Sequence, residues 1–168
     1  IRPVPEERLS ISDVLVARKR ITGFVTNTPL RKSHWMSDVS QAEVWMKLEN
    51  LQVTGSFKYR GALNAMTFAK ERGISRVFTA SAGNHALGMA EAARTTEREA
   101  TICLPTNVSS VKKQKLERFS VGIIQHGDDM DLTEHFAARI RARAGERVEE
   151  QVRAGFEIAL GRSPDDDE

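Results

Sequence analysis

The chain has 168 residues, of which 40% are hydrophobic and 29% are charged, and its formal net charge is +2. These values are typical of one compact soluble domain, or of one domain and part of another, and no apolar run approaches the roughly 18 residues that a membrane-spanning helix needs. The 25 basic and 23 acidic residues are interspersed, which argues against nucleic acid as a partner. The single cysteine, Cys103, excludes an intrachain disulfide and fits a cytoplasmic location.

The first 73 residues are predicted to contain a helix, a strand and a second helix, over residues 12–21, 42–49 and 57–72. Ser12 and Asp13 can cap the first helix. The strand leads into a turn at residues 54–56. Gly73 follows the second helix at the position that a C-terminal capping glycine prefers.

Strands and helices alternate over the rest of the chain. Strands are predicted at residues 76–80, 100–104 and 121–125, and helices at 84–94, 110–118 and 132–144. This alternation predicts an α/β fold with an open, twisted parallel sheet flanked by helices. In such sheets ligands bind at the carboxyl ends of the strands. From residue 145 onward we expect a further helix and then an acidic, disordered tail.

Two segments that join a strand to a helix carry residues suited to chemistry. Lys58 follows Gly55-Ser56-Phe57 and begins the helix predicted at residues 57–72. The segment Ser81-Ala82-Gly83-Asn84-His85 follows the strand at residues 76–80 and opens the next helix. A desolvated lysine amine can act as a nucleophile and as a base. Backbone N–H groups at a helix N-terminus favour anions.

Together the two segments resemble the threonine/serine dehydratase branch of the fold type II pyridoxal-phosphate enzymes, which have a tryptophan synthase beta-like fold. The resemblance runs from about Ser12 to about Ile140. It implies that pyridoxal 5'-phosphate is the cofactor and that Lys58 forms a Schiff base with it and is the catalytic residue. It also implies that Phe57 packs against the cofactor ring and that Asn84 donates a hydrogen bond to the ring hydroxyl oxygen.

The same resemblance implies the substrate and the reaction. Residues Ser81, Ala82, Gly83, Asn84 and His85 would bind the carboxylate of a small hydroxy amino acid. The implied reaction is the α,β-elimination of L-threonine or L-serine to 2-oxobutyrate or pyruvate and ammonia, in an enzyme that forms homo-oligomers and needs no membrane, nucleic acid or metal. Hydroxyaspartate ammonia-lyase and serine racemase remain alternatives. Racemases of this branch usually have a serine at the position of Ala82, and alanine cannot donate a proton, so the dehydratase is favoured.

The resemblance also divides the chain into domains. Residues 1–67 would form the N-terminal part of the large domain with Lys58, residues 68–144 the small α/β domain, and residues 145–168 a remnant or an extension. Relatives have a glycine-rich loop around the cofactor phosphate further along their chains, and this chain has no such glycine run. We therefore expect the N-terminal portion of a dehydratase. The alternative is a non-catalytic module that keeps the fold and associates with a full-length relative.

Other conspicuous side chains have structural interpretations. Cys103 is expected to be buried in a strand, and Trp35 and Trp45 are expected in the core. Three histidines, His34, His126 and His135, lack metal-ligand spacing and are interpreted as structural or surface residues. The role of His85 stays open between packing and substrate contact.

Overall fold

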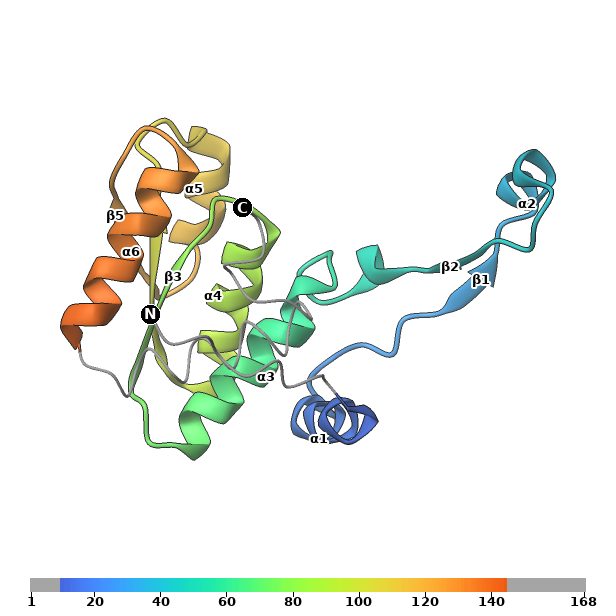
Figure 1. Ribbon diagram of the computed structural model, residues 1–168, viewed down its shortest axis with the longest axis horizontal. Helices are drawn as coiled ribbons and strands as arrows, with labels where there is room; N and C mark the ends of the chain where they lie inside the picture. The colour runs from blue at the N-terminus through green and yellow to red at the C-terminus, as the bar shows by residue number, and fades with distance from the viewer. Residues whose placement is uncertain (1–9, 145–168) are drawn as a thin grey trace.

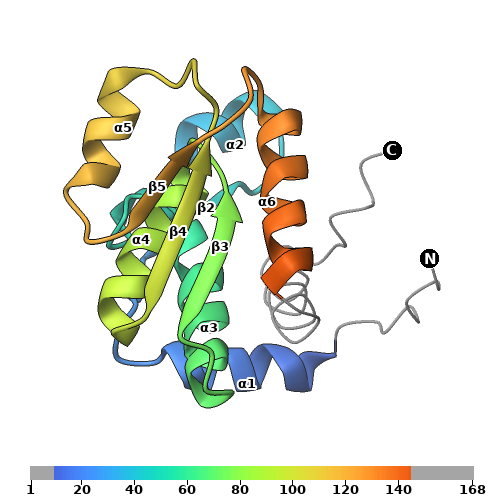
Figure 2. The same cartoon turned by 90° about the vertical axis from the view of Figure 1, so that its left-hand side faces the viewer.

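The computed structural model describes residues 10–144, which contain a three-stranded parallel sheet with helices on both faces. The strands lie in the order β3 (Arg76–Ala80), β4 (Glu99–Leu104) and β5 (Gly122–Gln125). Helices α3 (Lys58–Glu71), α4 (Asn84–Thr96) and α5 (Ser110–Glu117) lie on one face of the sheet, and α6 (Met130–Ala144) covers the other (Figures 1 and 2). The predicted α/β fold with an open parallel sheet is confirmed.

The boundaries of these elements agree with the predicted ones to within about two residues. The register pairs Ala80 with Cys103 and Leu104 with Gln125, so the strands end at one edge of the sheet. Cys103 is fully buried in β4, as expected. Among the described residues, no helix is long and apolar enough to cross a membrane, and no three His, Cys, Asp or Glu side chains are placed to hold a metal ion.

The first helix, α1 (Ile11–Ile21), begins with a cap other than the predicted one. Ser10 is the N-cap, and its hydroxyl accepts a hydrogen bond from the Asp13 backbone N–H at 3.3 Å. The Asp13 carboxylate in turn accepts from the Ser10 backbone N–H at 2.8 Å. This reciprocal capping box makes Asp13 the third helical residue rather than part of the cap.

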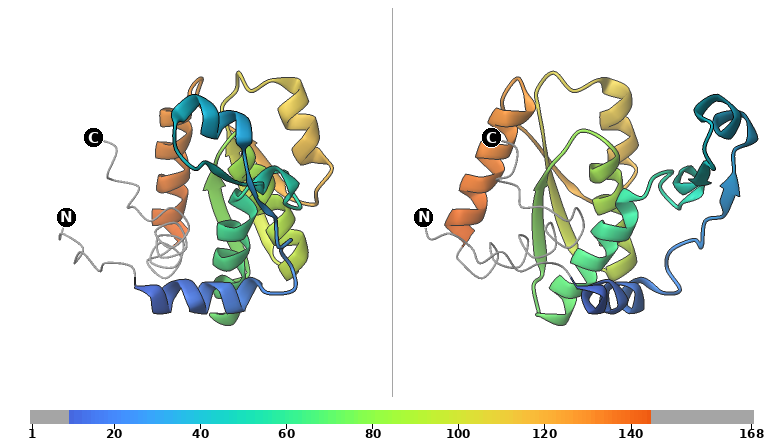
Figure 3. Two further views of the ribbon diagram at one scale, coloured as in Figure 1. Left: turned by 90° about the vertical axis from the view of Figure 1, so that its right-hand side faces the viewer. Right: turned by 45° about the vertical axis from the view of Figure 1, so that its right-hand side comes forward.

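Residues 30–51 form an arm that extends away from the sheet (Figures 1 and 3). It consists of β1 (Leu30–Lys32), α2 (His34–Ser40), β2 (Trp45–Lys47) and the 3₁₀-helix η1 (Glu49–Leu51), with β1 and β2 antiparallel. The sequence prediction missed β1 and α2 and made β2 too long. The core placement of the tryptophans was also wrong, because Trp35 is 73% exposed and Trp45 is 54% exposed. Within residues 10–144, β1 and β2 form a separate two-stranded sheet, and no described residue covers these rings fully.

The core lies between the sheet and the helices on its α3 side. Fully buried Leu63 and Met66 of α3 pack with small residues of α4 such as Ala92. A second cluster joins Ala86 and Ala90 of α4 to Ile102 and Leu104 of β4 and to Leu116 of α5. Small side chains along α4 let this helix approach both α3 and the sheet closely. Helix α4 therefore occupies the centre of the layer.

The glycines Gly127 and Gly73 allow a test of the turn between β5 and α6. Both residues have left-handed φ values, +74° and +72°, but a Cβ on Gly127 would lie 2.6 Å from Leu132 Cβ, whereas a Cβ on Gly73 would meet nothing within 4 Å. Gly73→Ala should lower the free energy of unfolding by roughly 1–2 kcal/mol, the cost of a left-handed backbone at a residue with a Cβ. Gly127→Ala should cost about 1–3 kcal/mol more because of the clash.

The measurement is the free energy of unfolding of both variants from denaturant titration, with the wild-type chain alongside. Equal losses in the two variants would show that the clash at Leu132 is relieved without cost.

Candidate active site

Lys58 is the first residue of α3, directly after Phe57, which is the N-cap residue of that helix. The Lys58 Nζ lies 5.2 Å from the centroid of the Phe57 ring, within the range of a cation–π contact. Lys58 is partly buried and Phe57 is 52% exposed. The amine therefore sits beside an aromatic ring that a ligand can reach.

The segment Ser81–His85 connects the carboxyl end of β3 to the start of α4. The backbone N–H of Ser81 donates to the Cys103 carbonyl oxygen at 3.2 Å, which ties the segment to β4. The Ser81 hydroxyl accepts from the Gly83 N–H at 3.3 Å. Gly83 is the N-cap of α4, and no side chain caps this helix. The first N–H groups of α4 thus point from a helix N-terminus without a side-chain acceptor, an arrangement that favours anions.

Gly88 brings the two segments together. It lies one turn into α4, where an added Cβ would be 3.1 Å from the Lys58 carbonyl carbon and 3.2 Å from both the Lys58 oxygen and the Tyr59 nitrogen. All three contacts are with backbone atoms, so α3 and α4 can approach this closely only without a side chain at position 88. The N-termini of both helices lie at the same end of the layer (Figure 1). A glycine inside an apolar helical pattern is the sequence feature that could have indicated this contact.

His85 is held between β3 and Lys58. Its Nε2 lies 3.1 Å from the Thr79 Oγ1, and the two atoms share a hydrogen bond. Burial, and to a smaller extent the charge of Lys58, lowers the pKa of His85 to about 4. The imidazole is therefore neutral at physiological pH. The contact with Thr79 supports the packing interpretation of this residue and does not test substrate contact.

The loop before Lys58 contains polar groups whose hydrogen-bonding capacity is unused. Thr54 Oγ1 and Ser56 Oγ are buried and have no hydrogen-bond partner among the described residues. Buried polar atoms are nearly always paired in proteins, which makes such groups candidates for contact with a polar ligand. A primary amine, an accessible aromatic ring, spare hydroxyls and an uncapped helix N-terminus together fit a ligand with a carbonyl, a ring and anionic groups.

The structure thus places all the predicted site residues in two segments on one end of the sheet, around the α3–α4 contact. Lys58 and Phe57 are adjacent on α3, and Ser81, Ala82, Gly83, Asn84 and His85 form the loop and first turn of α4. Within the Ser81–His85 segment, His85 has an electrostatic link to Lys58. The sequence analysis missed Gly88, and it missed the ion pair between Glu49 and Arg60, whose residues lie eleven positions apart.

Comparisons with known proteins point to one family. The model of the family described as pyridoxal-phosphate dependent enzyme matches residues 21–165. The catabolic L-threonine dehydratase of Staphylococcus aureus (strain USA300) is 35% identical over 142 residues, which cover 82% of this chain and 40% of the relative. An L-threo-3-hydroxyaspartate ammonia-lyase of a Pseudomonas species is 39% identical over 116 residues, which cover 68% of this chain and 36% of the relative.

The fold comparison agrees with the sequence comparison. The crystal structure of serine racemase from Dictyostelium discoideum superposes with a TM-score of 0.72 at 27% identity, and the match covers 81% of this chain and 45% of that one. The chain therefore spans less than half the length of these relatives.

The neutral state of His85 predicts a pH dependence of stability. Because its pKa in the folded chain, about 4, lies below the ordinary value of 6.5, only the unfolded chain binds the proton between these two values. The free energy of unfolding should fall as the pH falls from about 6.5 to about 4, by at most about 1.4 kcal/mol per pH unit from this group.

His85→Gln should remove this component of the pH dependence, measured by denaturant titration at several pH values. His34→Gln, at an exposed histidine, is the control and should leave it in place. Retention of the full slope in His85→Gln would assign the pH dependence to other groups.

Proposed function

This chain belongs to the family of pyridoxal-phosphate dependent enzymes, and we propose that it provides the cofactor lysine and the carboxylate site of an enzyme that eliminates water and ammonia from a small hydroxy amino acid. The observation that carries the proposal is the position of Lys58. Its amine lies beside the accessible Phe57 ring, and its backbone is held by Gly88 against the helix that begins at the Ser81–His85 segment.

When bound, pyridoxal phosphate supplies an electron sink that stabilises negative charge at the substrate Cα. Lys58 would hold the cofactor through its Nζ, and the released amine would take the proton from Cα. His85 is uncharged above pH about 4, so it places no second positive charge beside the Lys58 amine, to which we assign the proton transfer. Phe57 would pack against the cofactor ring, and Asn84 would bind the ring hydroxyl oxygen.

The substrate carboxylate would bind at the start of α4. The start of α4 at Asn84 has no side-chain cap, and the hydroxyl of Ser81 lies in the segment that leads into it. A clamped carboxylate fixes the rotation about the bond between Cα and the amino nitrogen, which directs the Cα–H bond toward the lysine. Ala82 lies in the same segment and has no proton to donate, so elimination is favoured over racemisation.

We propose L-threonine or L-serine as the substrate, with 2-oxobutyrate or pyruvate and ammonia as products. The similarity to a catabolic L-threonine dehydratase supports this choice, and the similarity to an L-threo-3-hydroxyaspartate ammonia-lyase keeps the hydroxyaspartate alternative. We further propose a cytoplasmic homo-oligomer, and a division into residues 1–67 of a large domain and residues 68–144 of a small one.

A second candidate is a non-catalytic module that associates with a longer relative. The exposure of large apolar side chains on the arm favours it, because Trp35, Val39 and Trp45 are each more than half exposed. The two candidates differ in whether the chain alone turns over an amino acid.

The proposed function predicts that Lys58→Ala abolishes both cofactor attachment and turnover. The chain is incubated with pyridoxal phosphate, its visible absorbance is recorded, and the 2-oxo acid released from L-threonine and L-serine is assayed. Loss of the catalytic base should lower turnover by at least about 100-fold. Lys70→Ala, at an exposed lysine on the same helix, is the matched control and should change neither readout.

Equal cofactor spectra in Lys58→Ala and the wild-type chain would overturn the assignment of Lys58. A spectrum that depends on Lys58 without release of a 2-oxo acid would favour the non-catalytic module.

A further inference from the structure

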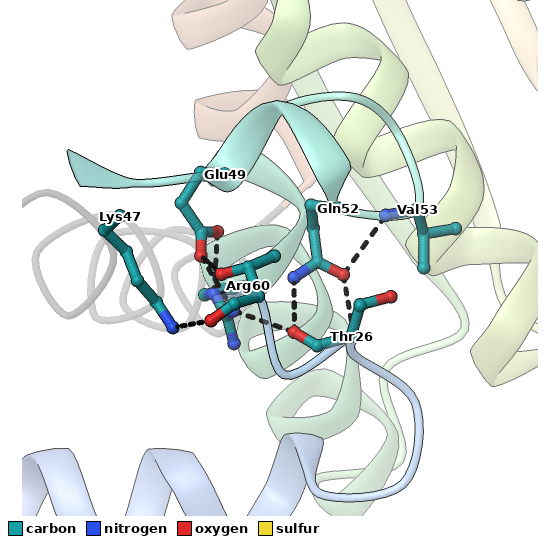
Figure 4. Close-up of polar contacts among 7 residues, drawn as sticks. Thr26, Lys47, Glu49, Gln52, Val53 and Arg60 are labelled. Carbon is teal, nitrogen blue, oxygen red and sulfur yellow. Dashed lines mark hydrogen bonds and ion pairs between the residues drawn. The ribbon is translucent and has the colours of Figure 1, made fainter. Parts of the chain in front are cut away.

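A network of polar contacts at the base of the arm joins three segments of the chain beside Lys58 (Figure 4). The segments are residues 26–28 before β1, residues 47–53 around η1, and Arg60 in the first turn of α3. Arg60 lies two residues after Lys58, and the segment of residues 47–53 ends five residues before Lys58. The network therefore contacts the chain both before and after Lys58.

The centre of the network is an ion pair with two parallel hydrogen bonds. Arg60 Nε and Nη2 donate to the two carboxylate oxygens of Glu49, each at 2.9 Å. Arg60 Nη2 also donates to the Thr26 carbonyl oxygen at 2.9 Å. The Thr28 hydroxyl donates to Glu49, and Lys47 Nζ donates to the Thr28 carbonyl oxygen. A planar guanidinium held by two carboxylate bonds and one carbonyl bond fixes both the position and the rotation of its helix turn.

The Glu49 carboxylate keeps its charge over the whole range in which the protein would work. The hydrogen bonds from Arg60 are the largest cause, and together with Thr28 they lower the pKa of Glu49 to about 2 against the opposing effect of burial. The Glu49 and Arg60 side chains are 18% and 29% exposed, so water screens the pair less than it screens a surface ion pair. Both members of the Glu49–Arg60 ion pair therefore keep their charges at neutral pH.

Gln52 anchors the loop that leads into Lys58. Its side chain is buried with the residue only 4% exposed, and it accepts from the backbone N–H groups of Thr26 at 2.8 Å and Val53 at 3.1 Å. Its Nε2 donates to the Thr26 carbonyl oxygen at 3.0 Å. The Gly55 N–H then donates to the Gln52 carbonyl oxygen at 2.7 Å and closes the turn before Ser56. Hydrogen bonds therefore fix the loop that precedes Lys58 as well as the helical turn that follows it.

The first turn of α3, which carries Lys58, begins without a side-chain cap. It is unlike α1 and α2 in this respect, which Ser10 and Ser33 cap. Gly88 lets α4 pack closely against the Lys58 backbone. We propose that Glu49, Gln52 and Arg60 are positioning residues that orient Lys58 for reaction with the cofactor, an inference that rests on the proposed function.

The chain contains a matched control pair on the same helix. Arg20 of α1 and Glu71 at the far end of α3 form a second ion pair, with Arg20 Nε at 3.2 Å and 3.1 Å from the two Glu71 oxygens. Both pairs tie α3 to residues that precede it in the chain, but Glu71 lies thirteen positions from Lys58. Loss of either pair should affect stability, whereas loss of the first alone should affect Lys58.

The experiment compares Glu49→Gln and Arg60→Lys with Glu71→Gln. Each chain is incubated with a limiting amount of pyridoxal phosphate and reduced with borohydride, and mass spectrometry of the digested chain gives the share of label at Lys58 relative to all other lysines. The free energy of unfolding of each variant is measured in parallel.

We expect the Lys58 share to fall about tenfold in Glu49→Gln, since small displacements of a reacting group have large effects on rate. Arg60→Lys keeps the charge but cannot form the paired bonds, so its fall should be intermediate. Glu71→Gln should keep the wild-type share even where its loss of stability equals that of Glu49→Gln.

The outcomes separate this inference from the proposed function. A wild-type chain without preferential label at Lys58 would overturn the proposed function. Preferential label in the wild-type chain that persists in Glu49→Gln and Arg60→Lys would overturn the positioning role alone. If Glu49→Gln fails to fold, Arg60→Lys decides the question, and an unchanged Lys58 share in that variant overturns the inference.

Discussion

The close contact between α3 and α4 at Gly88 is the constraint on which the rest of the site depends. Both helices begin at the same end of the layer (Figure 1), and each begins at a segment whose residues are suited to chemistry. A side chain at position 88 would strike the backbone of Lys58 and Tyr59. Its absence lets the first turn of α3, which carries the lysine, pack against α4 one turn from its uncapped start. The fold thus builds the site from two helix N-termini rather than from one long loop.

The charges around this contact are arranged so that few of them change near neutral pH. Glu49 remains ionised because Arg60 and Thr28 donate to it, and His85 remains neutral because it is buried near Lys58. One carboxylate held charged and one imidazole held uncharged give the lysine a constant electrostatic setting. Under the proposed function, Lys58 attaches to a carbonyl and moves a proton, and both steps benefit from neighbours that do not compete for the proton.

Local patterns carried the prediction of the parallel sheet, since β3, β4 and β5 are short apolar runs bounded by turns and helices. Lys58 and the Ser81–His85 segment were proposed as site residues from the resemblance to a known family, which contiguous residues carry, and their roles stay predictions. What the sequence did not reveal was non-local. The bonds between Arg60 and Glu49 and between Gln52 and Thr26 join residues with no periodic relation. The prediction that the tryptophans are buried failed for a similar reason. Residue type predicts burial only where another layer of the structure covers the ring.

The arm is ordered by polar bonds at its base more than by a core of its own. Its strands have three residues each, α2 has no buried residue, and its tryptophans are exposed. The Glu49–Arg60 pair connects this arm directly to the first turn of α3, and the Gln52 side chain joins the base of the arm to Thr26. A rigid polar connection transmits displacement in both directions, so a contact that moved the arm would also move the turn that carries Lys58. The Glu49–Arg60 pair thus couples the exposed arm to the helical turn that carries Lys58.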